Sequence, residues 1–257
     1  MEKIFSDYIR ADGITFKHAN GESAQKGKEF HTYHEIILFL GGCAELITED
    51  IRLTLSEKTF IIIPKETYHQ MIIHGEQENY YRCIINFQDI PPVSDIIKKV
   101  LVTEADEHIM YLFKTLIDNV NGADAKELLR SVLVLLINET KHKENAVKTE
   151  KEQHISVQNA INYINSNLEK RITIADISKN CHISPSSLSH LFKKEMKIPL
   201  HRFIIKKRLI NAYHKITSGE DATTTAIECG FNDYSGFYKQ YKNKFGFPPS
   251  DFKRGNK

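Results

Sequence analysis

Histidine and carboxylate side chains gather in two short segments in the first half of this 257-residue chain. Residues 30–35 read FHTYHE, and a second segment, PKETYH, ends at His69. Imidazole and carboxylate groups at this spacing can bind a divalent metal ion, as in a metal-dependent enzyme. In a strand, however, alternation puts His31 and Tyr33 on one face and His34 on the other. We therefore expect no metal ion, no other cofactor and no catalytic residue, and the metal-dependent enzyme is the alternative.

A second set of polar side chains lies on two predicted helices of the other half, at about 184–195 and 233–245. Each helix has an apolar stripe at helical spacing, which predicts one buried face. The opposite faces carry hydroxyl, imidazole and ammonium groups, which can donate hydrogen bonds to phosphates and base edges. These candidate DNA-binding residues are Ser186, Ser187, Ser189, His190, Lys193 and Lys194 on the first helix, and Tyr234, Ser235, Tyr238, Lys239 and Lys242 on the second.

The two helices belong to an internal repeat in the second half of the chain. A displacement of 49 residues aligns Ile177 with Ala226 and Leu188 with Phe237, so that apolar positions fall on apolar positions. The surface positions between them differ. This pattern is typical of two copies of one supersecondary unit.

Each copy of the repeat reads as a helix-turn-helix motif. A short helix, at about 174–180 or 222–229, precedes each of the longer helices. Ser184 and Asp233 stand at the N-cap positions, where a side-chain oxygen accepts an otherwise unpaired backbone N–H. In a helix-turn-helix motif the second helix lies in the major groove of DNA. A further helix at about 199–217 joins the two copies.

The first half of the chain reads as β structure followed by helices. Seven short apolar segments between Ile14 and Phe87, at spacings near ten residues, predict a small sandwich or barrel. Helical spacing then follows in segments 93–102, 106–120 and 124–142. The last segment is apolar nearly all round, so we expect it to form a homodimer interface together with 106–120.

Charge is divided unevenly along the chain. Residues 1–150 contain 17 Lys and Arg against 24 Asp and Glu, whereas residues 151–257 contain 18 against 9. The basic second half is therefore expected to meet a polyanion such as double-stranded DNA, which the acidic first half would repel.

Cellular location is predicted from the features that the sequence lacks. No apolar run approaches the roughly 20 residues needed to cross a bilayer, and the N-terminal residues lack the apolar core of a secretory signal. We therefore expect no membrane contact and a cytoplasmic location. The four cysteines show no short-range pairing, which predicts reduced, small core residues.

The second half resembles the DNA-binding domain of AraC/XylS-type transcription regulators over roughly residues 153–254. The most specific part of the match is Ala226, Cys229-Gly230-Phe231, Phe237, Lys242, Phe245-Gly246 and Pro248-Pro249. The resemblance implies that the two recognition helices enter successive major grooves. It also implies that the base-facing residues are Ser186, Ser189 and His190 in the first helix and Tyr234, Ser235 and Lys239 in the second.

The first recognition helix departs from the family pattern at two positions. The family often has a larger or charged residue where this chain has Ser186, and arginine where it has His190. A serine hydroxyl and an imidazole make fewer strong contacts to bases. We therefore expect the second helix to carry more of the sequence specificity, and phosphate contacts to provide much of the affinity.

The first half resembles the cupin-like barrel that forms the sensory half of such regulators. The resemblance implies a pocket for a small polar effector, for example a sugar, lined by His31, Tyr33, Glu35 and His69, with Thr15 and Arg82 as outlying candidates. The first segment reads H-x-x-H-E, whereas metal-binding cupins have H-x-H with the glutamate several residues later. The remaining alternative is that these side chains lie at the surface and bind nothing.

Together these features predict a multidomain protein with β structure first and α structure second. We expect a cupin-like effector-binding barrel at 1–90, a helical dimerisation segment at 91–142, a linker at 143–153 and a DNA-binding domain with two helix-turn-helix motifs at 154–257. The predicted function is that of a sequence-specific transcription regulator, an effector-responsive activator that contacts RNA polymerase. The alternative is a metal-dependent cupin enzyme with an appended binding module.

Overall fold

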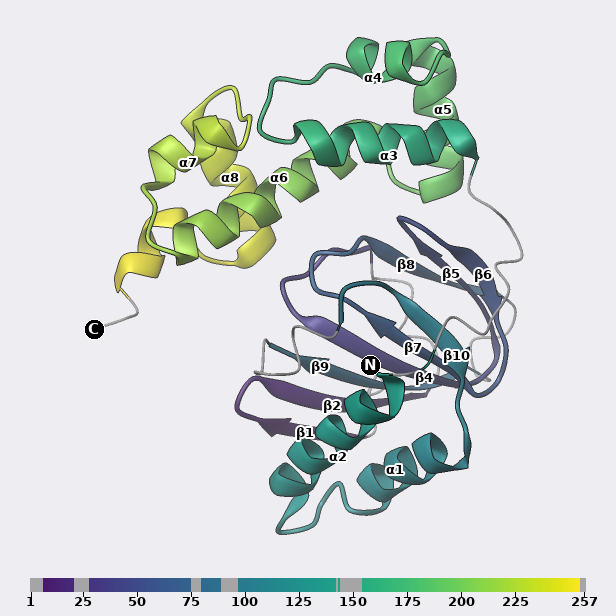
Figure 1. The fold of residues 1–257 in the computed structure, drawn as a ribbon. Coiled ribbons are helices and arrows are strands. Elements are labelled where there is room, and N and C mark those ends of the chain that lie inside the picture. Colours follow the sequence, from purple (N-terminus) through teal and green to yellow (C-terminus); the bar gives the residue numbers. More distant parts are fainter. Residues whose placement is uncertain are drawn as a thin grey trace. The chain divides into compact units, whose positions relative to one another are not determined.

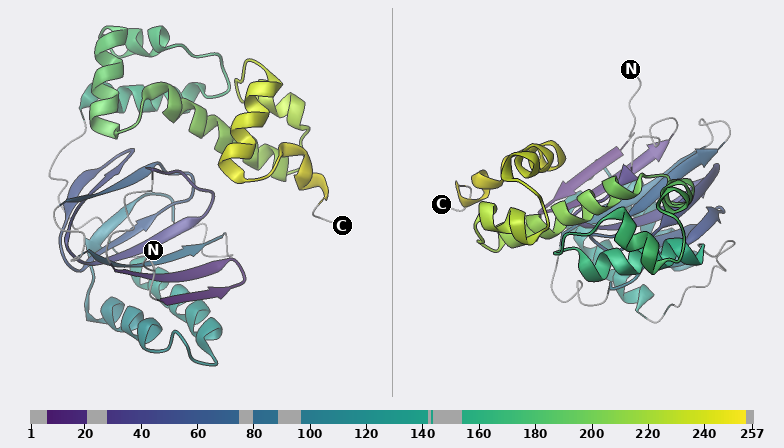
Figure 2. Two further views of the ribbon diagram at one scale, coloured as in Figure 1. Left: turned by 180° about the vertical axis from the view of Figure 1, so that it is seen from behind. Right: turned by 90° about the horizontal axis from the view of Figure 1, so that it is seen from above.

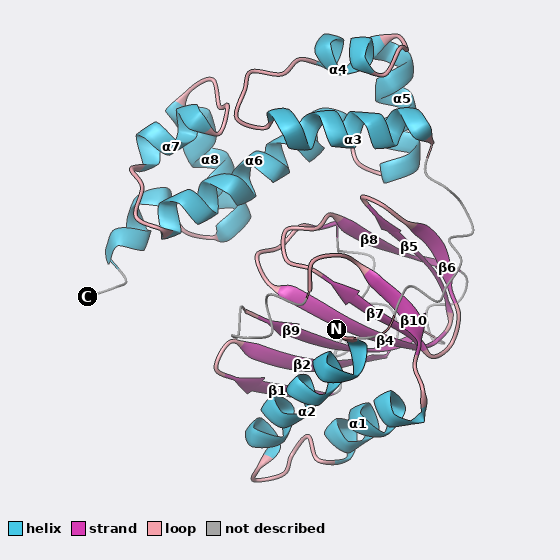
Figure 3. Ribbon diagram, in the orientation of Figure 1, coloured by secondary structure: helices cyan, strands magenta, loops and turns pink. Residues whose placement is uncertain are grey.

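The computed structural model of the chain describes residues 7–20, 28–74, 80–88, 97–141, 143 and 154–254. It divides the chain into two compact units, Met1–Glu152 and Gln153–Lys257. The first unit contains the described strands and two helices, and the second unit is helical (Figure 3). This is the predicted fold class. The expected linker, apart from Lys143, lies outside the described residues.

Two antiparallel sheets build the first unit (Figure 1). The larger sheet has the order β1 (Asp7–Ala11), β2 (Ile14–Asn20), β9 (Tyr81–Phe87), β4 (His34–Gly41), β7 (Thr59–Ile63) and β10 (Leu101–Glu104). The smaller sheet has the order β3 (Lys28–Glu29), β8 (His69–His74), β5 (Cys43–Thr48) and β6 (Arg52–Leu55). Within the described ranges no strand pairing joins the two sheets, so the cupin-like domain is an open sandwich and not the closed barrel that was expected.

Alternation along β4 sends its side chains into two different cores. Ile36 and Leu38 belong to the core that includes Phe113 of helix α1 (Glu107–Asp118) and Leu129 of helix α2 (Ala125–Thr140). These helices cover the outer face of the larger sheet (Figure 1). Ile37 and Phe39 instead pack with residues of the smaller sheet. Since Glu35 has the same parity as Ile37, it lies on the face between the sheets.

The seven predicted strands appear as β2 and β4 to β9, and the two longer predicted helices appear as α1 and α2. Three strands were missed. The helix expected at 93–102 is wrong where the chain is described, because residues 97–100 are not helical and β10 begins at Leu101. Val102 pairs with Ile61 and is 2% exposed, so sheet pairing outweighs a weak local pattern. Cys43 is exposed, contrary to the expectation that all four cysteines are core residues.

The described part of the second unit consists of six α-helices and a short 3-10 helix. Their bounds are α3 (Ile155–Asn167), α4 (Ile174–Asn180), α5 (Pro185–Met196), α6 (Leu200–Thr217), α7 (Ala222–Glu228), α8 (Tyr234–Phe245) and η3 (Pro249–Arg254). Helix α6 runs from the α3–α5 group to the α7–α8 group (Figure 2). No helix in the described part of the chain is long and apolar enough to cross a membrane.

Helix α6 takes part in the cores of both helix-turn-helix copies. Near its start, Phe203 packs edge-to-face on Phe192 of α5, with ring centroids 5.2 Å apart. Further along, Leu209 and Ile216 belong to the cluster built around Phe237 of α8. One helix therefore fixes the separation and the relative rotation of the two copies.

The capping signals read from the sequence are present in the structure. Ser187 N donates to Ser184 Oγ at 3.1 Å, and Gly236 N donates to Asp233 Oδ1 at 2.7 Å. The repeat itself needs one correction. Helices α5 and α8 begin 49 residues apart, at 185 and 234, but α4 and α7 begin 48 apart, at 174 and 222. The second turn is therefore one residue longer, and Ile177 corresponds to Thr225 and not to Ala226.

The second turn depends on a glycine next to the guanidinium of α6. Gly230 has a φ of 78°, and a Cβ there would lie 2.8 Å from Arg208 Cζ. Arg208 is held in place because it donates to Leu168 O at 3.2 Å and to Lys170 O at 2.8 Å. Arg208 therefore connects α6 to the residues that follow α3, and its guanidinium also lies against the turn of the second copy.

Gly230→Ala is expected to destabilise the second unit by about 1–3 kcal/mol from backbone strain, and further because of the clash with Arg208. Gly219→Ala is the matched control, since Gly219 also has a positive φ, 102°, but a Cβ there would meet no atom within 4 Å. Denaturant unfolding of the full chain measures both variants. Equal losses of stability in the two variants would contradict the proposed role of the Arg208 contact.

Candidate nucleic-acid interface and buried histidine cluster

Helix α5 presents its predicted DNA-binding residues on the surface of the second unit. Ser186, Ser187, His190, Lys193 and Lys194 are exposed, and Ser189 is half-buried. The hydroxyl of Ser189 donates to Pro185 O at 2.8 Å, and Ser187 Oγ is bonded to Ser184 Oγ at 2.8 Å. The hydroxyl groups of Ser187 and Ser189 are thus engaged within the first turns of their own helix.

Helix α8 presents a more basic and more aromatic surface. Ser235, Lys239 and Lys242 are exposed, Tyr234 is 36% exposed, and Tyr238 is half-buried. On the opposite side Phe237 and Tyr241, like Leu188 and Phe192 of α5, are fully buried at 0% exposure. The predicted division of each helix into a buried and an open face is therefore present.

The repeat displays the same polar pattern twice. Because α5 and α8 are related by 49 residues, Ser186 corresponds to Ser235, His190 to Lys239, and Lys193 to Lys242. Within each helix these positions follow the spacing i, i+4 and i+7, which puts them on one face. Two helices with matched, outward-facing rows of donors suit two equivalent sites on a repeating polyanion.

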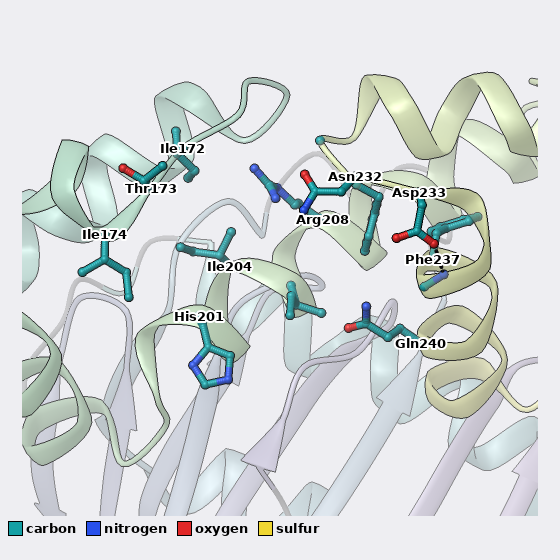
Figure 4. A pocket seen from close by; sticks show the side chains of 14 residues that line it. Ile172, Thr173, Ile174, His201, Ile204, Arg208, Asn232, Asp233, Phe237 and Gln240 are labelled. Atoms are coloured by element: carbon teal, nitrogen blue, oxygen red, sulfur yellow. Dashed lines mark hydrogen bonds between the residues drawn. The ribbon is translucent and has the colours of Figure 1, made fainter.

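A pocket of about 350 Å³ lies between the two copies and is bounded by α6 (Figure 4). Thr173, the N-cap of α4, lines one side of it, and Asp233, the N-cap of α8, lines the other. His201 and Arg208 of α6 form part of the wall between them. Helix α6 thus spans a gap between the copies, so the rigidity of this helix determines their relative position.

In the first unit, three of the predicted effector-binding residues meet in a buried cluster. His69 Nε2 lies 3.1 Å from Glu35 Oε2, and His31 Nε2 lies 3.8 Å from the same oxygen. The exposed fractions of His31, Glu35 and His69 are 6%, 7% and 2%, respectively. Glu35 comes from β4 of the larger sheet and His69 from β8 of the smaller one. The cluster therefore joins the two sheets of the sandwich.

Backbone carbonyl groups orient both imidazole rings. His31 Nδ1 lies 2.7 Å from Tyr33 O, and His69 Nδ1 lies 3.2 Å from Thr67 O. A carbonyl oxygen can only accept, so each Nδ1 carries the hydrogen. The ring of Tyr33, the fourth predicted residue, stacks on His31 with centroids 3.8 Å apart. All four residues are thus in one place, with both Nε2 atoms directed at Glu35.

The charge of Glu35 is retained despite its burial. Burial by itself raises the pKa of this carboxyl, but His31 and His69 outweigh burial and hold the pKa well below its usual range. Glu35 is therefore a buried carboxylate held between two imidazole rings.

The other candidates from the sequence lie outside this cluster. The ring of His34 is on the opposite face of β4, stacked on Phe87, as alternation predicted, and its Nδ1 accepts from Lys65 N at 3.2 Å. Arg82 lies over the ring of Tyr80 and donates to Met71 Sδ. Among the described contacts none joins Arg82 or Thr15 to the cluster.

One residue near the cluster was missed in the sequence. Asn86 of β9 pairs with Glu35 in the strand register, and its Oδ1 is buried without a hydrogen-bond partner. Residues paired across a sheet share a face. Only the pairing of β4 with β9 brings Asn86 to this site, so no local signal in the sequence could have identified it.

Two helix-turn-helix motifs on a shared helix, in a chain that also contains a β-sandwich unit, are the features of a DNA-binding protein. A family model described as a helix-turn-helix domain matches residues 177–255. The second unit therefore carries a helix-turn-helix domain, and the chain is similar to the AraC/XylS-type transcription regulators.

Known relatives agree with this assignment. The probable transcriptional regulator LumQ of Photobacterium leiognathi is 24% identical over 236 residues, which cover 90% of this chain and 94% of LumQ. A helix-turn-helix-type transcriptional regulator encoded in the cgkA 5' region of Pseudoalteromonas carrageenovora is 31% identical over 112 residues, covering 44% of this chain and 67% of that protein. ToxT from Vibrio cholerae aligns over 94% of this chain and 98% of its own, but at 14% identity and a TM-score of 0.41 it supports no argument about a shared ligand.

Replacing Lys239 with alanine is expected to cost about 1–3 kcal/mol on a duplex selected for tight binding and little on a scrambled duplex, because a lysine near base edges discriminates between bases. His190→Ala, at the corresponding position, should cost less. Lys242→Ala and Lys193→Ala should weaken both duplexes equally and lower the salt slope by about 0.9 for each lost phosphate contact.

Titrations of both duplexes at two salt concentrations separate these effects. Lys114→Ala, at an exposed lysine of α1 in the other unit, is the control and should change neither affinity. If Lys239→Ala weakens the two duplexes equally, Lys239 contacts phosphate and the assignment of base reading to α8 is wrong.

Proposed function

We propose that this sequence-specific DNA-binding regulator is an effector-responsive activator that works as a homodimer. The observation that carries the DNA-binding mode is the pair of matched polar rows on α5 and α8, held by one helix that belongs to both cores. A small ligand in the first unit, recognised near His31, Tyr33, Glu35 and His69, would change how the second unit engages DNA or RNA polymerase.

The length of α6 supports simultaneous binding of the two recognition helices. Its 18 residues span about 27 Å at 1.5 Å per residue. Successive major grooves on one side of DNA are about 34 Å apart. Recognition helices attached at either end of α6 can therefore reach neighbouring grooves without bending the linking helix.

The buried cluster supports a ligand in the first unit more than it supports catalysis. Charged and polar groups are costly to bury without partners, so their retention between two sheets favours a binding role. Their near-complete burial also leaves little surface for a substrate to reach. A polar metabolite such as a sugar matches the chemistry of the four residues, although the small exposed area favours a smaller ligand.

Selection of bound duplexes from a random pool tests DNA recognition by the full chain. We expect the selected sequences to share two short segments, one for each recognition helix. A pool without enrichment would contradict sequence-specific binding. With the selected site placed upstream of a reporter promoter, an increase in transcript supports activation, and a decrease would identify a repressor.

The proposed dimer uses an apolar surface on α1 and α2. Tyr111, Val134 and Leu135 are 65%, 47% and 44% exposed. His108 Nδ1 lies 2.9 Å from Glu139 Oε1 and shows how the two helices are aligned. One turn further along each helix, this alignment brings Tyr111 beside Leu135. Large apolar side chains grouped on a surface are typical of protein contacts.

Leu135→Glu and Tyr111→Glu are each expected to shift the full chain from dimer to monomer in sedimentation, because a carboxylate would be buried in the interface. Lys126→Glu changes an exposed position at the start of α2 and is the control. A wild-type chain that is monomeric at about 100 µM would overturn the proposed dimer.

A further inference from the structure

We propose that His31, Glu35 and His69 bind a divalent transition-metal ion such as zinc, and that this ion is the ligand to which the regulator responds. This inference rests on the proposed ligand-responsive function and names the chemical class of the ligand. It replaces the expectation from the sequence that no metal is bound.

The chemistry of the three donor atoms is the first argument. Both Nδ1–H groups point to carbonyl oxygens, so in the neutral rings both Nε2 atoms present lone pairs. Neither Nε2 makes a hydrogen bond of standard geometry, although both lie near Glu35 Oε2 and His31 is 6% and His69 is 2% exposed. Together with the Glu35 carboxylate they form three acceptors that face one another without a donor. A cation satisfies all three at once.

The geometry is the second argument. The donor atoms lie within 4.8 Å of one another, with individual separations of 3.1 and 3.8 Å to Glu35 Oε2. Two donors that are each about 2.1 Å from a tetrahedral zinc ion are about 3.4 Å apart. Small side-chain rotations therefore bring the three atoms to coordination distance. Metal-binding histidines characteristically donate their other N–H to a carbonyl or carboxylate, as both rings do here.

The position of the cluster between two sheets explains how a bound ion would change the structure of the first unit. Glu35 and His69 come from different sheets, so a bound ion would link them by coordinate bonds. Asn86 Oδ1, buried and unbonded on the strand next to Glu35, is a candidate fourth ligand. Binding of that ion would alter the packing of both sheets.

The competing explanation is a simple ion pair in which one histidine is protonated and donates Nε2–H to Glu35. Such a pair leaves the second Nε2 without a partner. A metal titration separates the two explanations, because an ion pair does not retain metal.

The test uses the full chain, freed of metal with a chelator and titrated with Co²⁺, whose visible spectrum reports its ligands. We expect one Co²⁺ per chain with the bands of nitrogen and oxygen ligation and no thiolate charge-transfer band from the four cysteines. Elemental analysis after desalting should show one zinc per zinc-loaded chain. Absence of both signals in the wild-type chain would overturn the proposal, whatever the variants do.

Glu35→Gln and His69→Gln should each weaken metal affinity by at least about 100-fold, more than the loss of an outer partner costs. His108→Gln is the matched control, since it removes an exposed histidine that is also paired with a glutamate, at 2.9 Å. Thermal unfolding of each variant confirms that it is folded. Folded Glu35→Gln and His69→Gln variants that bind metal as the wild type does would overturn the site.

DNA affinity measured with and without zinc in the same samples separates this inference from the proposed function. We expect zinc to change the affinity of the wild type for its selected duplex by roughly 5–150-fold, and that of Glu35→Gln far less. Specific DNA binding without metal binding overturns only the metal site. Metal binding without specific DNA binding overturns the proposed function.

Discussion

The structure of the DNA-binding unit depends on one helix shared by two hydrophobic cores. Phe203 of α6 packs in the first helix-turn-helix copy, and Leu209, Ala212 and Ile216 pack in the second. Since both sets of contacts use one continuous helix, neither copy can rotate about α6 without losing its own core. The Arg208 guanidinium adds a second constraint, because it bonds the chain after α3 while it fills the space beside Gly230. The two predicted recognition helices therefore form a rigid pair.

Because the two helices are held rigidly, the side chains at equivalent positions of their exposed faces can be compared directly. The pairs Ser186 and Ser235, His190 and Lys239, and Lys193 and Lys242 occupy equivalent places on two helices that cannot adjust independently. If the two residues of a pair differ in chemistry, the two recognition helices are expected to differ in their contribution to DNA binding at that position. The lysine at 239 gives the second copy a permanent charge where the first has an imidazole, and the matched lysines at 193 and 242 put an ammonium group at the same position of both copies. We therefore expect the two copies to contribute unequally to sequence specificity, although their architecture is the same.

The helical unit could be predicted from the sequence in detail, because its signals are local. N-caps at Ser184 and Asp233, apolar positions at helical spacing and the repeat locate α4 to α8 within one or two residues. The first unit was less predictable. The strand β10 is four residues long and is formed through pairing with β7, so no local pattern marks it in the sequence. Pairing between β4 and β9 brings Asn86 to Glu35, and the packing of the two sheets brings His69 to the same place. The sequence therefore predicted which residues were candidates for the site, but it did not predict their contacts.

Helix α6 holds the two predicted recognition helices at a fixed separation suited to successive major grooves. Insertion of five base pairs between the two segments of a selected duplex tests it most directly, since half a helical turn moves the second groove to the opposite side of the DNA. Affinity of the full chain for the expanded duplex should fall to that for a scrambled sequence. Unchanged affinity for the expanded duplex would show that the two copies bind independently, and would contradict the account.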